Sequence, residues 1–427
     1  MSDLALLGGQ PVRSQPFPEW PIVEESDVQA VAEVVRSGAW GRLGANQVHE
    51  FEKAFAAYQG AAYGLSVNSG GVALELALMC LHLPRGAEVL VPAYTYMATA
   101  TCILRAGLTP VFVDIHEDTY NIDPNRLESA VTDQTGAILV VHFGGLSCDM
   151  DAVLAVAEKH DLRVVEDSAH AHGATWRNRG LGTIGDVGCF SFQASKNLNA
   201  GEGGILLTND AEIYTRAIEY HDLWAGGMLE REGQIGQGSM RSGATWDYPV
   251  AASSNRMPTY QAVLLHRQLE RLEDQTERRA ANAAYLDDLL DDLEGIQPRR
   301  QDDWVTRNSQ HLYICRYDPD AFDGLPRESF IKALNAEGIP VAPGYGRALH
   351  RTGLFQDRNG ELARFWNRNG GEPDIDYQSA PCPVTERLCA GETLWLSQNV
   401  FLDTPEGMTQ IASAIEKIRA SASDLMP

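Results

Sequence analysis

Residues 162–170 read LRVVEDSAH, and this stretch decides the class of fold. The first six are rich in apolar and β-branched side chains, which is typical of a strand buried on both faces. The run ends at Asp167, and His170 follows three positions later. In an open α/β sheet the carboxyl ends of the strands face the ligand crevice, so these two side chains are predicted to meet one ligand. The alternatives are a capping aspartate beside a packed histidine, or a metal pair, for which no third ligand of suitable spacing stands nearby.

Five similar runs recur along the chain, and helical patterns separate most of them. They occupy residues 88–92, 110–114, 137–142, 187–192 and 204–208. Residues 150–160 lie just before the run at 162 and are long enough for a crossover helix. Such alternation predicts βαβ units and a largely parallel sheet whose strands are covered on both faces. We therefore expect one large α/β domain.

The rest of the chain is expected to form a smaller α+β domain. A helical pattern from residue 256 to about 293 has apolar side chains spaced for one buried face, and we expect it to bridge the two domains. The elements expected after it are a strand at 311–317, a helix near 327–337, another strand near Pro340 and a last helix at 405–420. The chain thus divides into an N-terminal segment (residues 1–24), the large domain (residues 25–260), and the bridging helix with the small domain (residues 261–427).

Composition and charge exclude several classes of protein. Of 427 residues, 44% are hydrophobic and 22% are charged, which excludes a disordered or fibrous chain. The 58 acidic and 34 basic side chains give a net charge of −24, which argues against a surface for nucleic acid or anionic lipid. No apolar stretch reaches the roughly 18 residues of a membrane-spanning helix. Seven cysteines without a C-x-x-C pair, and no secretory leader before them, indicate reduced thiols in a cytoplasmic protein.

Residues 68–71 read NSGG and open an apolar helical pattern at 72–83. Small residues at such a place let backbone N–H groups and a helix N-terminus close on an anion such as phosphate. The alternative is an ordinary N-cap without a ligand. Residues 224–254 are glycine-rich and polar, and a loop of this length suggests a lid over the substrate.

Residues 190–197 read FSFQASKN, and a glycine-rich return at 200–204 leads to the next strand. A lysine at this place, Lys196, can be desolvated and held at the floor of a cleft. Burial lowers the pKa of a lysine and makes the neutral amine available for Schiff-base chemistry. A solvated surface lysine is the alternative reading, because lysines are rarely buried without a reason.

Taken together, a phosphate cradle, a carboxylate at a strand end and a lysine are the parts that a pyridoxal 5′-phosphate (PLP) site requires. PLP needs a lysine for its Schiff base, an acid for its pyridine nitrogen and an anchor for its phosphate. The acid keeps the ring nitrogen protonated, so that the ring can withdraw electrons. Lys196, once released, can act as the base that moves the proton. We therefore predict PLP as the cofactor, with no metal.

The ordered motifs resemble those of the DegT/DnrJ/EryC1/StrS aminotransferases. The matching segments are Asn68-Ser69-Gly70-Gly71, Pro92-Ala93-Tyr94-Thr95-Tyr96, Glu166-Asp167-Ser168-Ala169-His170, Ser191-Phe192-Gln193-Ala194-Ser195-Lys196 and Ser254-Asn255-Arg256-Met257. The similarity runs in order from about Leu6 to the last helix. It implies the α/β fold of PLP-dependent transferases of fold type I, with a large, mostly parallel-sheet domain and a smaller C-terminal α+β domain.

By motif position, the resemblance implies a role for each site residue. Lys196 would bind the cofactor as a Schiff base, Asp167 would pair with the pyridine nitrogen, and His170 would lie near the phenolic oxygen. The further cofactor-binding residues that it implies are Tyr96, stacked on the ring, with Ser69, Gly70, Gly71, Ser191, Gln193 and Asn255. Asn255 would reach the phosphate from the neighbouring subunit, so a homodimer with its site at the subunit interface is expected.

Two positions test how closely the chain follows the family. Gly71 departs from it, because the family commonly has a threonine there that donates a hydroxyl to the phosphate; backbone donors could replace it. Lys196 argues against the sugar dehydratases of the family, in which a histidine replaces the lysine.

Within the family, the chain looks most like the members that act on cyclitol ketones. The similarity rests on Leu7-Gly8-Gly9-Gln10-Pro11-Val12, Pro18-Glu19-Trp20-Pro21 and Cys382-Pro383-Val384-Thr385-Glu386-Arg387. Those members are the L-glutamine:scyllo-inosose and 2-deoxy-scyllo-inosose aminotransferases of aminoglycoside pathways, with the aminohydroxybenzoate synthases close by. The expected reaction moves an amino group from L-glutamine or L-glutamate to a keto-cyclitol or keto-sugar. The alternatives are a nucleotide-linked keto-sugar as acceptor, held by arginines such as Arg231 or Arg241, and a non-catalytic PLP- or sugar-binding regulator.

Overall fold

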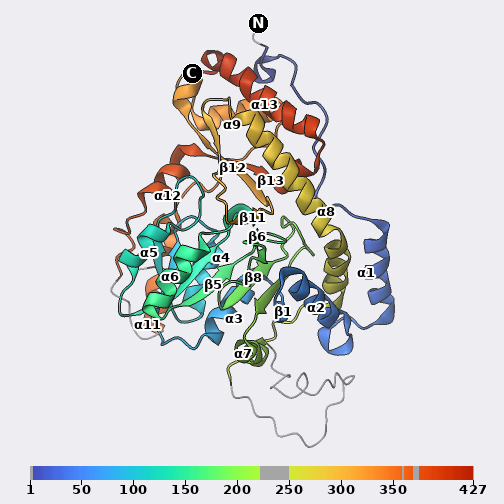
Figure 1. Ribbon diagram of the computed structural model, residues 1–427, viewed down its shortest axis with the longest axis vertical. Helices are drawn as coiled ribbons and strands as arrows, with labels where there is room; N and C mark the ends of the chain where they lie inside the picture. Colours follow the sequence, from blue (N-terminus) through green and yellow to red (C-terminus); the bar gives the residue numbers. More distant parts are fainter. Residues whose placement is uncertain (1–2, 222–249, 358–359, 369–374, 427) are drawn as a thin grey trace, which may run out of the picture.

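A seven-stranded, mostly parallel sheet lies at the centre of the large half of the molecule (Figure 1). The computed structural model describes residues 3–221, 250–357, 360–368 and 375–426. The strands, in their order across the sheet, are β1 (Tyr63–Val67), β9 (Gly204–Thr208), β8 (Val187–Ser191), β5 (Arg163–Asp167), β4 (Thr135–Val141), β2 (Glu88–Pro92) and β3 (Thr109–Val113). Neighbours from β8 to β3 are parallel, whereas β9 is antiparallel to both β8 and β1.

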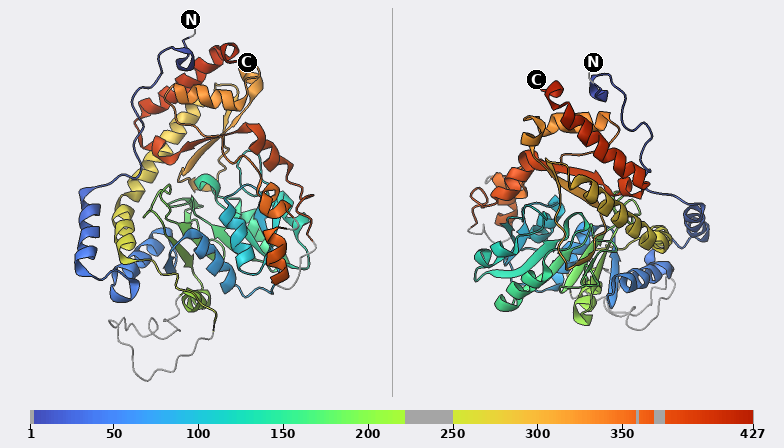
Figure 2. Two further views of the ribbon diagram at one scale, coloured as in Figure 1. Left: turned by 180° about the vertical axis from the view of Figure 1, so that it is seen from behind. Right: turned by 45° about the horizontal axis from the view of Figure 1, so that its top comes forward.

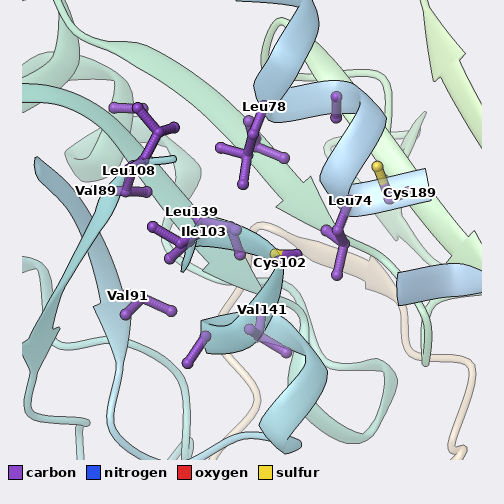
Figure 3. Packing of buried hydrophobic residues seen from close by; sticks show 14 of the residues in the cluster. Leu74, Leu78, Val89, Val91, Cys102, Ile103, Leu108, Leu139, Val141 and Cys189 are labelled. Carbon is purple, nitrogen blue, oxygen red and sulfur yellow. The ribbon is translucent and has the colours of Figure 1, made fainter. Parts of the chain in front are cut away.

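Helices cover both faces of this sheet. One face carries α3 (Gly70–Cys80), α4 (Met97–Arg105) and α7 (Ala211–His221), and the other carries α5 (Pro124–Ala130) and α6 (Met150–His160). Val89 and Val91 of β2 belong to the first core, together with Leu74 and Ile103 from the helices (Figure 3). Leu90, between them, belongs to the core under α5 and α6. Because both faces are buried, these strands read as continuous apolar runs in the sequence.

A long helix, α8 (Thr259–Leu290), connects the two halves of the molecule (Figures 1 and 2). Helices α1 (Glu25–Ser37) and α2 (Gln47–Gln59) pack on it beside the large sheet, and α13 (Pro405–Ala420) packs on it beside the small one. The small sheet is antiparallel, in the order β10 (Ile296–Pro298), β12 (Leu312–Tyr317) and β13 (Thr393–Ser397). Helices α9 (Arg327–Ala336) and α13 share its core, and both chain termini lie at this end (Figure 2).

A third, three-stranded sheet forms where the two halves meet. It contains β11 (Val305–Arg307), β6 (Thr175–Trp176) and β7 (Arg179–Gly180), so the chain returns to the large half between β10 and β12. The remaining helices are short: α10 (Gly353–Gln356), α11 (Glu361–Arg368) and α12 (Pro383–Arg387). All seven cysteines lie within the described residues, where each is buried and none forms a disulfide. Among the helices of the described ranges, none combines the length and the apolar character needed to cross a membrane.

Most elements expected from the sequence are present, with ends shifted by a few residues; β2, β9, α6 and α13 have the predicted bounds. The expected strand near Pro340 is wrong. Only Ala342 pairs there, exchanging backbone hydrogen bonds of 2.9 and 2.8 Å with Trp395. The next residues that would face β13 are 340 and 344, and neither continues the ladder: Pro340 has no N–H to donate, and Gly344 has a φ of +75°, outside the extended range. The expected loop at 224–254 lies, as far as residue 249, outside the described residues.

Candidate active site

The predicted site residues gather at the carboxyl ends of the central strands. Asp167 is the last residue of β5, and Lys196 lies in the turn after β8. The parallel register sets Asp167 opposite Cys189 of β8, so the two strand ends lie side by side. Ser69 caps α3, and Tyr96 precedes α4. The structure thus brings together the cradle, the acid and the lysine that the sequence predicts.

Asp167 is a buried carboxylate held by donors on both oxygens. Its Oδ2 accepts a hydrogen bond of 2.8 Å from Thr99 Oγ1, and its Oδ1 accepts one of 3.2 Å from the Ala169 N–H. Thr95 Oγ1 lies 2.9 Å from Thr99 Oγ1 and extends the network. Burial raises the pKa of Asp167, while these donors and the charge of Lys196 oppose that rise. The carboxylate is therefore fixed in place and gains from a cationic partner.

Lys196 ends a tight turn in which its N–H donates to the Gln193 carbonyl at 2.9 Å. Its side chain is half-buried, and its Nζ makes no hydrogen bond or ion pair with the part of the chain that the structure describes. Desolvation lowers the pKa of the Lys196 amine to about 8, against the attraction of Asp167. A large fraction of this amine is therefore neutral near pH 8 and can attack a carbonyl carbon.

A tight cradle forms where α3 begins above β8 and β9. Ser69 Oγ accepts a hydrogen bond of 3.3 Å from the Val72 N–H and so caps the helix. A Cβ atom on Gly70 would lie 2.6 Å from Cβ of Ser191, and one on Gly204 would lie 2.6 Å from the carbonyl carbon of Ser69. Glycine at these two positions lets the helix N-terminus approach the ends of the strands, which is the geometry that a phosphate group requires.

Gly71 differs from Gly70. A Cβ atom there would meet only Cβ of Ala98, at 3.7 Å, so packing does not demand a glycine. The departure from the family pattern at Gly71 therefore removes a possible hydroxyl without being needed for the close approach.

His170 is buried, and its tautomer follows from its contacts. The Gly144 N–H donates to His170 Nδ1 at 3.1 Å, which leaves the proton of the neutral ring on Nε2. Burial, with the nearby charge of Lys196, holds the pKa of His170 well below its usual range. The side chain is thus a neutral imidazole whose Nε2–H has no acceptor among the described residues.

Tyr96, Gln193 and Asn255 lie at the rim of this site. Tyr96 is 64% exposed, so its ring is free to stack on the ring of a cofactor. Gln193 uses its side chain locally, because its Oε1 accepts from the Ser195 N–H and hydroxyl at 2.9 and 2.8 Å. The Asn255 carbonyl accepts a bond of 3.0 Å from the N–H of Asn68, so its backbone adjoins the cradle of its own chain. The cofactor contacts of these three side chains stay predictions.

Sequence reasoning missed two pairs of residues. Thr99, with Thr95, holds Asp167 from 68 positions away. Asn197 and His311, 114 positions apart, meet beside His170, whose ring centre lies 4.2 Å from that of His311. The only signal for Asn197 was its place after the lysine; nothing in the sequence marked Thr99 or His311 as neighbours of the site.

Beneath the site, Glu166 organises the loop that precedes β8. Its carboxylate accepts hydrogen bonds from the N–H groups of Gly182, Ile184 and Gly185, each of 2.7 Å, and lies 2.8 Å from His142 Nε2. Burial opposes the ionised form, but these donors outweigh it and lower the pKa of Glu166. The alternate direction of side chains along β5 therefore gives Asp167 to the site and Glu166 to the scaffold.

Comparisons with known proteins agree with this geometry. A family model described as the DegT/DnrJ/EryC1/StrS aminotransferase family matches residues 21–369. A putative L-glutamine:3-amino-2,3-dideoxy-scyllo-inosose aminotransferase of Micromonospora echinospora is 36% identical over 424 residues, which cover 97% of each chain. An L-glutamine:2-deoxy-scyllo-inosose aminotransferase of Streptomyces fradiae is 35% identical over 432 residues, covering 100% of this chain and 99% of the relative. The crystal structure of a 3-amino-5-hydroxybenzoic acid synthase matches with a TM-score of 0.80 and 30% identity, covering 96% of this chain and 100% of that one.

Proposed function

Because the chain belongs to the DegT/DnrJ/EryC1/StrS aminotransferase family, we propose that it moves the amino group of L-glutamine or L-glutamate to a keto-cyclitol or keto-sugar. It is a PLP-dependent aminotransferase of fold type I. The observation that carries the proposal is the amine of Lys196, which is desolvated, lacks a hydrogen-bond partner among the described residues, and lies beside the buried carboxylate of Asp167.

The residues of this site fit PLP. The approach of Gly70 to Ser191 leaves room for a phosphate rather than for side chains at the N-terminus of α3. Ser69, Gly70, Gly71 and Ser191 would hold the phosphate, and Asp167 would hold the pyridine nitrogen. Once bound, PLP supplies an electron sink that lets the α-proton of an amino acid be removed.

The side chains of the protein would then bind the cofactor and move the protons. Lys196 Nζ would bind the cofactor and, once displaced by the donor, take the proton from the donor α-carbon. The Asp167 carboxylate would keep a proton on the pyridine nitrogen, because a buried carboxylate without a cation is unfavourable. His170 would present its Nε2–H to the phenolic oxygen, since its Nδ1 is already engaged by Gly144. Tyr96 would cover the ring.

We infer a two-step reaction in which donor and acceptor use the same site in turn. The donor leaves as a keto acid, and the acceptor then enters and receives the amino group. The names of the relatives favour a cyclitol ketone over a nucleotide-linked sugar as acceptor. The arginines that could serve a diphosphate, Arg231 and Arg241, lie outside the described residues. The net charge of −24 fits an uncharged acceptor at least as well as a nucleotide diphosphate.

We further propose that the protein is a cytoplasmic homodimer whose sites lie at the subunit interface. Exposed apolar side chains support the interface: Trp40 is 56% exposed, Leu43 39% and Tyr260 44%. The segments that carry Trp40 and Tyr260 are neighbours, because the Thr259 N–H donates to the Trp40 carbonyl at 2.8 Å, and Tyr260 follows Asn255 closely along the chain. An exposed apolar patch next to a site is typical of a protein interface. The domain division at residues 25–260 and 261–427 is likewise our proposal.

The absorbance spectrum of the PLP-loaded protein tests this function. Addition of L-glutamine or L-glutamate should replace the yellow band by the spectrum of pyridoxamine phosphate, and addition of a cyclitol ketone such as scyllo-inosose should restore it. A Lys196→Ala protein should do neither at the wild-type rate. A wild-type protein that binds PLP but responds to no amino donor would contradict the proposal.

A further inference from the structure

A short buried segment links the two halves of the molecule directly behind the site. Residues 308–311 connect β11, which pairs with the large half, to β12 of the small sheet. All four residues are buried, and Gln310 has a φ of +49°, a value that side-chain-bearing residues adopt only where the surroundings enforce it. A connection of this kind normally runs over the surface, so its position here calls for a physical reason.

The segment is bonded to both sides of the candidate site. Ser309 Oγ donates to the His170 carbonyl at 2.7 Å, and Gly145 allows this approach, because a Cβ there would lie 2.2 Å from Ser309 Oγ. On the other side, Asn197 Nδ2 donates to the Ser309 carbonyl at 2.8 Å. The connection therefore bonds to the backbone of His170 on one side and to the side chain of Asn197, the residue that directly follows Lys196, on the other.

These contacts fix the tautomer of His311. The Ser309 carbonyl can only accept, so Asn197 must present its Nδ2 there and its Oδ1 to His311 Nδ1, 3.0 Å away. An amide oxygen only accepts, so His311 Nδ1 carries the proton. His170 has the opposite tautomer, with its proton on Nε2, because the Gly144 N–H occupies its Nδ1.

The two imidazoles pack against one another in a tilted arrangement. Their ring centres are 4.2 Å apart and their planes are inclined by 33°. Both rings are buried and neutral, since burial and the charge of Lys196 hold the pKa values of both well below their usual range. Two neutral rings at this distance attract by dispersion and limit one another's rotation.

We propose that His311 is a positioning residue, which fixes the plane of the His170 ring by stacking on it while Asn197 locks His311 itself. This inference rests on the proposed function, in which His170 Nε2–H faces the phenolic oxygen of the cofactor. These contacts have a second effect. Through Asn197 and Ser309 they connect the position of His170 to the Lys196 turn and to the start of the small sheet.

The pH titration of the visible band of the PLP-loaded protein tests the proposal without measuring activity. A hydrogen-bond donor at the phenolic oxygen of the cofactor stabilises the negative charge on that oxygen. This charge helps to retain the titrating proton beside it, so the donor lowers the pH at the midpoint of the titration. In His311→Ala the donor is no longer held, and the midpoint should rise by about half a pH unit or more. His311→Phe keeps a ring in the stack and should rise much less, and Asn197→Ala should fall between the two. His160→Ala, at the surface, is the control and should titrate like the wild type.

The outcomes separate this inference from the proposed function. A folded His311→Ala protein with the wild-type midpoint would overturn the positioning role, as would a His311→Phe protein shifted as far as His311→Ala. Visible circular dichroism and thermal unfolding of each variant show whether it is folded and loaded. If the wild type itself formed no PLP band, the proposed function would fail instead.

Discussion

At the residue scale, the site depends on polar groups whose state is set by burial. Asp167 and Lys196 were predictable, because each stands just after an apolar strand pattern, where the sheet opens to its ligand. Thr99 and His311 were not, since their contacts with the site cross 68 and 114 residues of chain and exist only once the sheet has formed. A single sequence shows which groups can react, but not which distant groups hold them.

The hydrogen bond from Thr99 should lower the pKa of Asp167. Thr99→Val keeps the shape of the side chain but removes the 2.8 Å hydrogen bond to Oδ2, so the pKa of Asp167, already raised by burial, should rise further. In the proposed mechanism activity requires the ionised carboxylate, so the loss of activity on acidification should begin at a higher pH in the variant. At neutral pH we expect a loss of kcat of about 10-fold. Thr101→Val, on the same helix, is a suitable control, and an unchanged acidic limb in a pH–rate profile would contradict the role of Thr99.

Lys196 should take up PLP in a pH-dependent manner. Its amine has a pKa of about 8, below the usual lysine value, so it is protonated and unreactive below that pH and neutral above it. The association rate of PLP with the cofactor-free protein, followed by absorbance in a stopped-flow instrument, should rise with pH around a midpoint near 8 and level off only above it. Lys196→Ala should form no adduct that borohydride can reduce. A midpoint near 10 would mean that the amine is solvated.

At the scale of elements, the cradle is made by the approach of α3 to the strands β8 and β9. The antiparallel pairing of β9 with β1 and β8 brings Gly204 under Ser69 and Ser191 under Gly70. The sequence predicted a glycine-rich turn before a helix, and the structure supplies the reason for each glycine. Gly70 is required by contact with another element, whereas a Cβ on Gly71 would make only an ordinary van der Waals contact with Ala98.

A matched pair of substitutions should reveal this difference. Gly70→Ala places a methyl group 2.6 Å from Cβ of Ser191 and should push α3 off β8, so we expect PLP affinity to fall about 10-fold or more. Gly71→Ala, with 3.7 Å to Ala98, should bind PLP like the wild type. Equilibrium dialysis of PLP against both proteins measures the effect. Equal affinities would show that the close approach does not matter for the phosphate.

At the scale of the whole molecule, the sequence predicted where six of the seven strands of the large sheet lie along the chain, but not the way in which the two halves join. The runs at 88–92 and 204–208 are buried on both faces, so their composition marks them as strands. The strands β6, β7 and β11 have only two or three residues each and no apolar period, and they form because the halves meet. Interfaces between distant segments are also where the site acquires Ser309 and His311.

The shared site of the proposed homodimer makes a prediction about mixed dimers. The Asn255 backbone adjoins the cradle of its own chain through its hydrogen bond to Asn68. In the proposed dimer, the Asn255 side chain instead binds the phosphate in the site of the partner subunit. Lys196→Ala and Asn255→Ala homodimers should each be strongly impaired. In a mixed dimer both changes fall on one site and leave the other intact, so co-expression of the two variants should restore about a quarter of the wild-type activity.

Two controls make this result decisive. Lys196→Ala co-expressed with itself should stay inactive, and light scattering after size-exclusion chromatography should show a dimer in every sample. If Asn255 serves its own subunit, each site of the mixed dimer carries one defect, and activity will not exceed half that of the Asn255→Ala protein. Recovery above that level requires two chains in one site, because no arrangement within a single chain places intact copies of Lys196 and Asn255 together in the mixture.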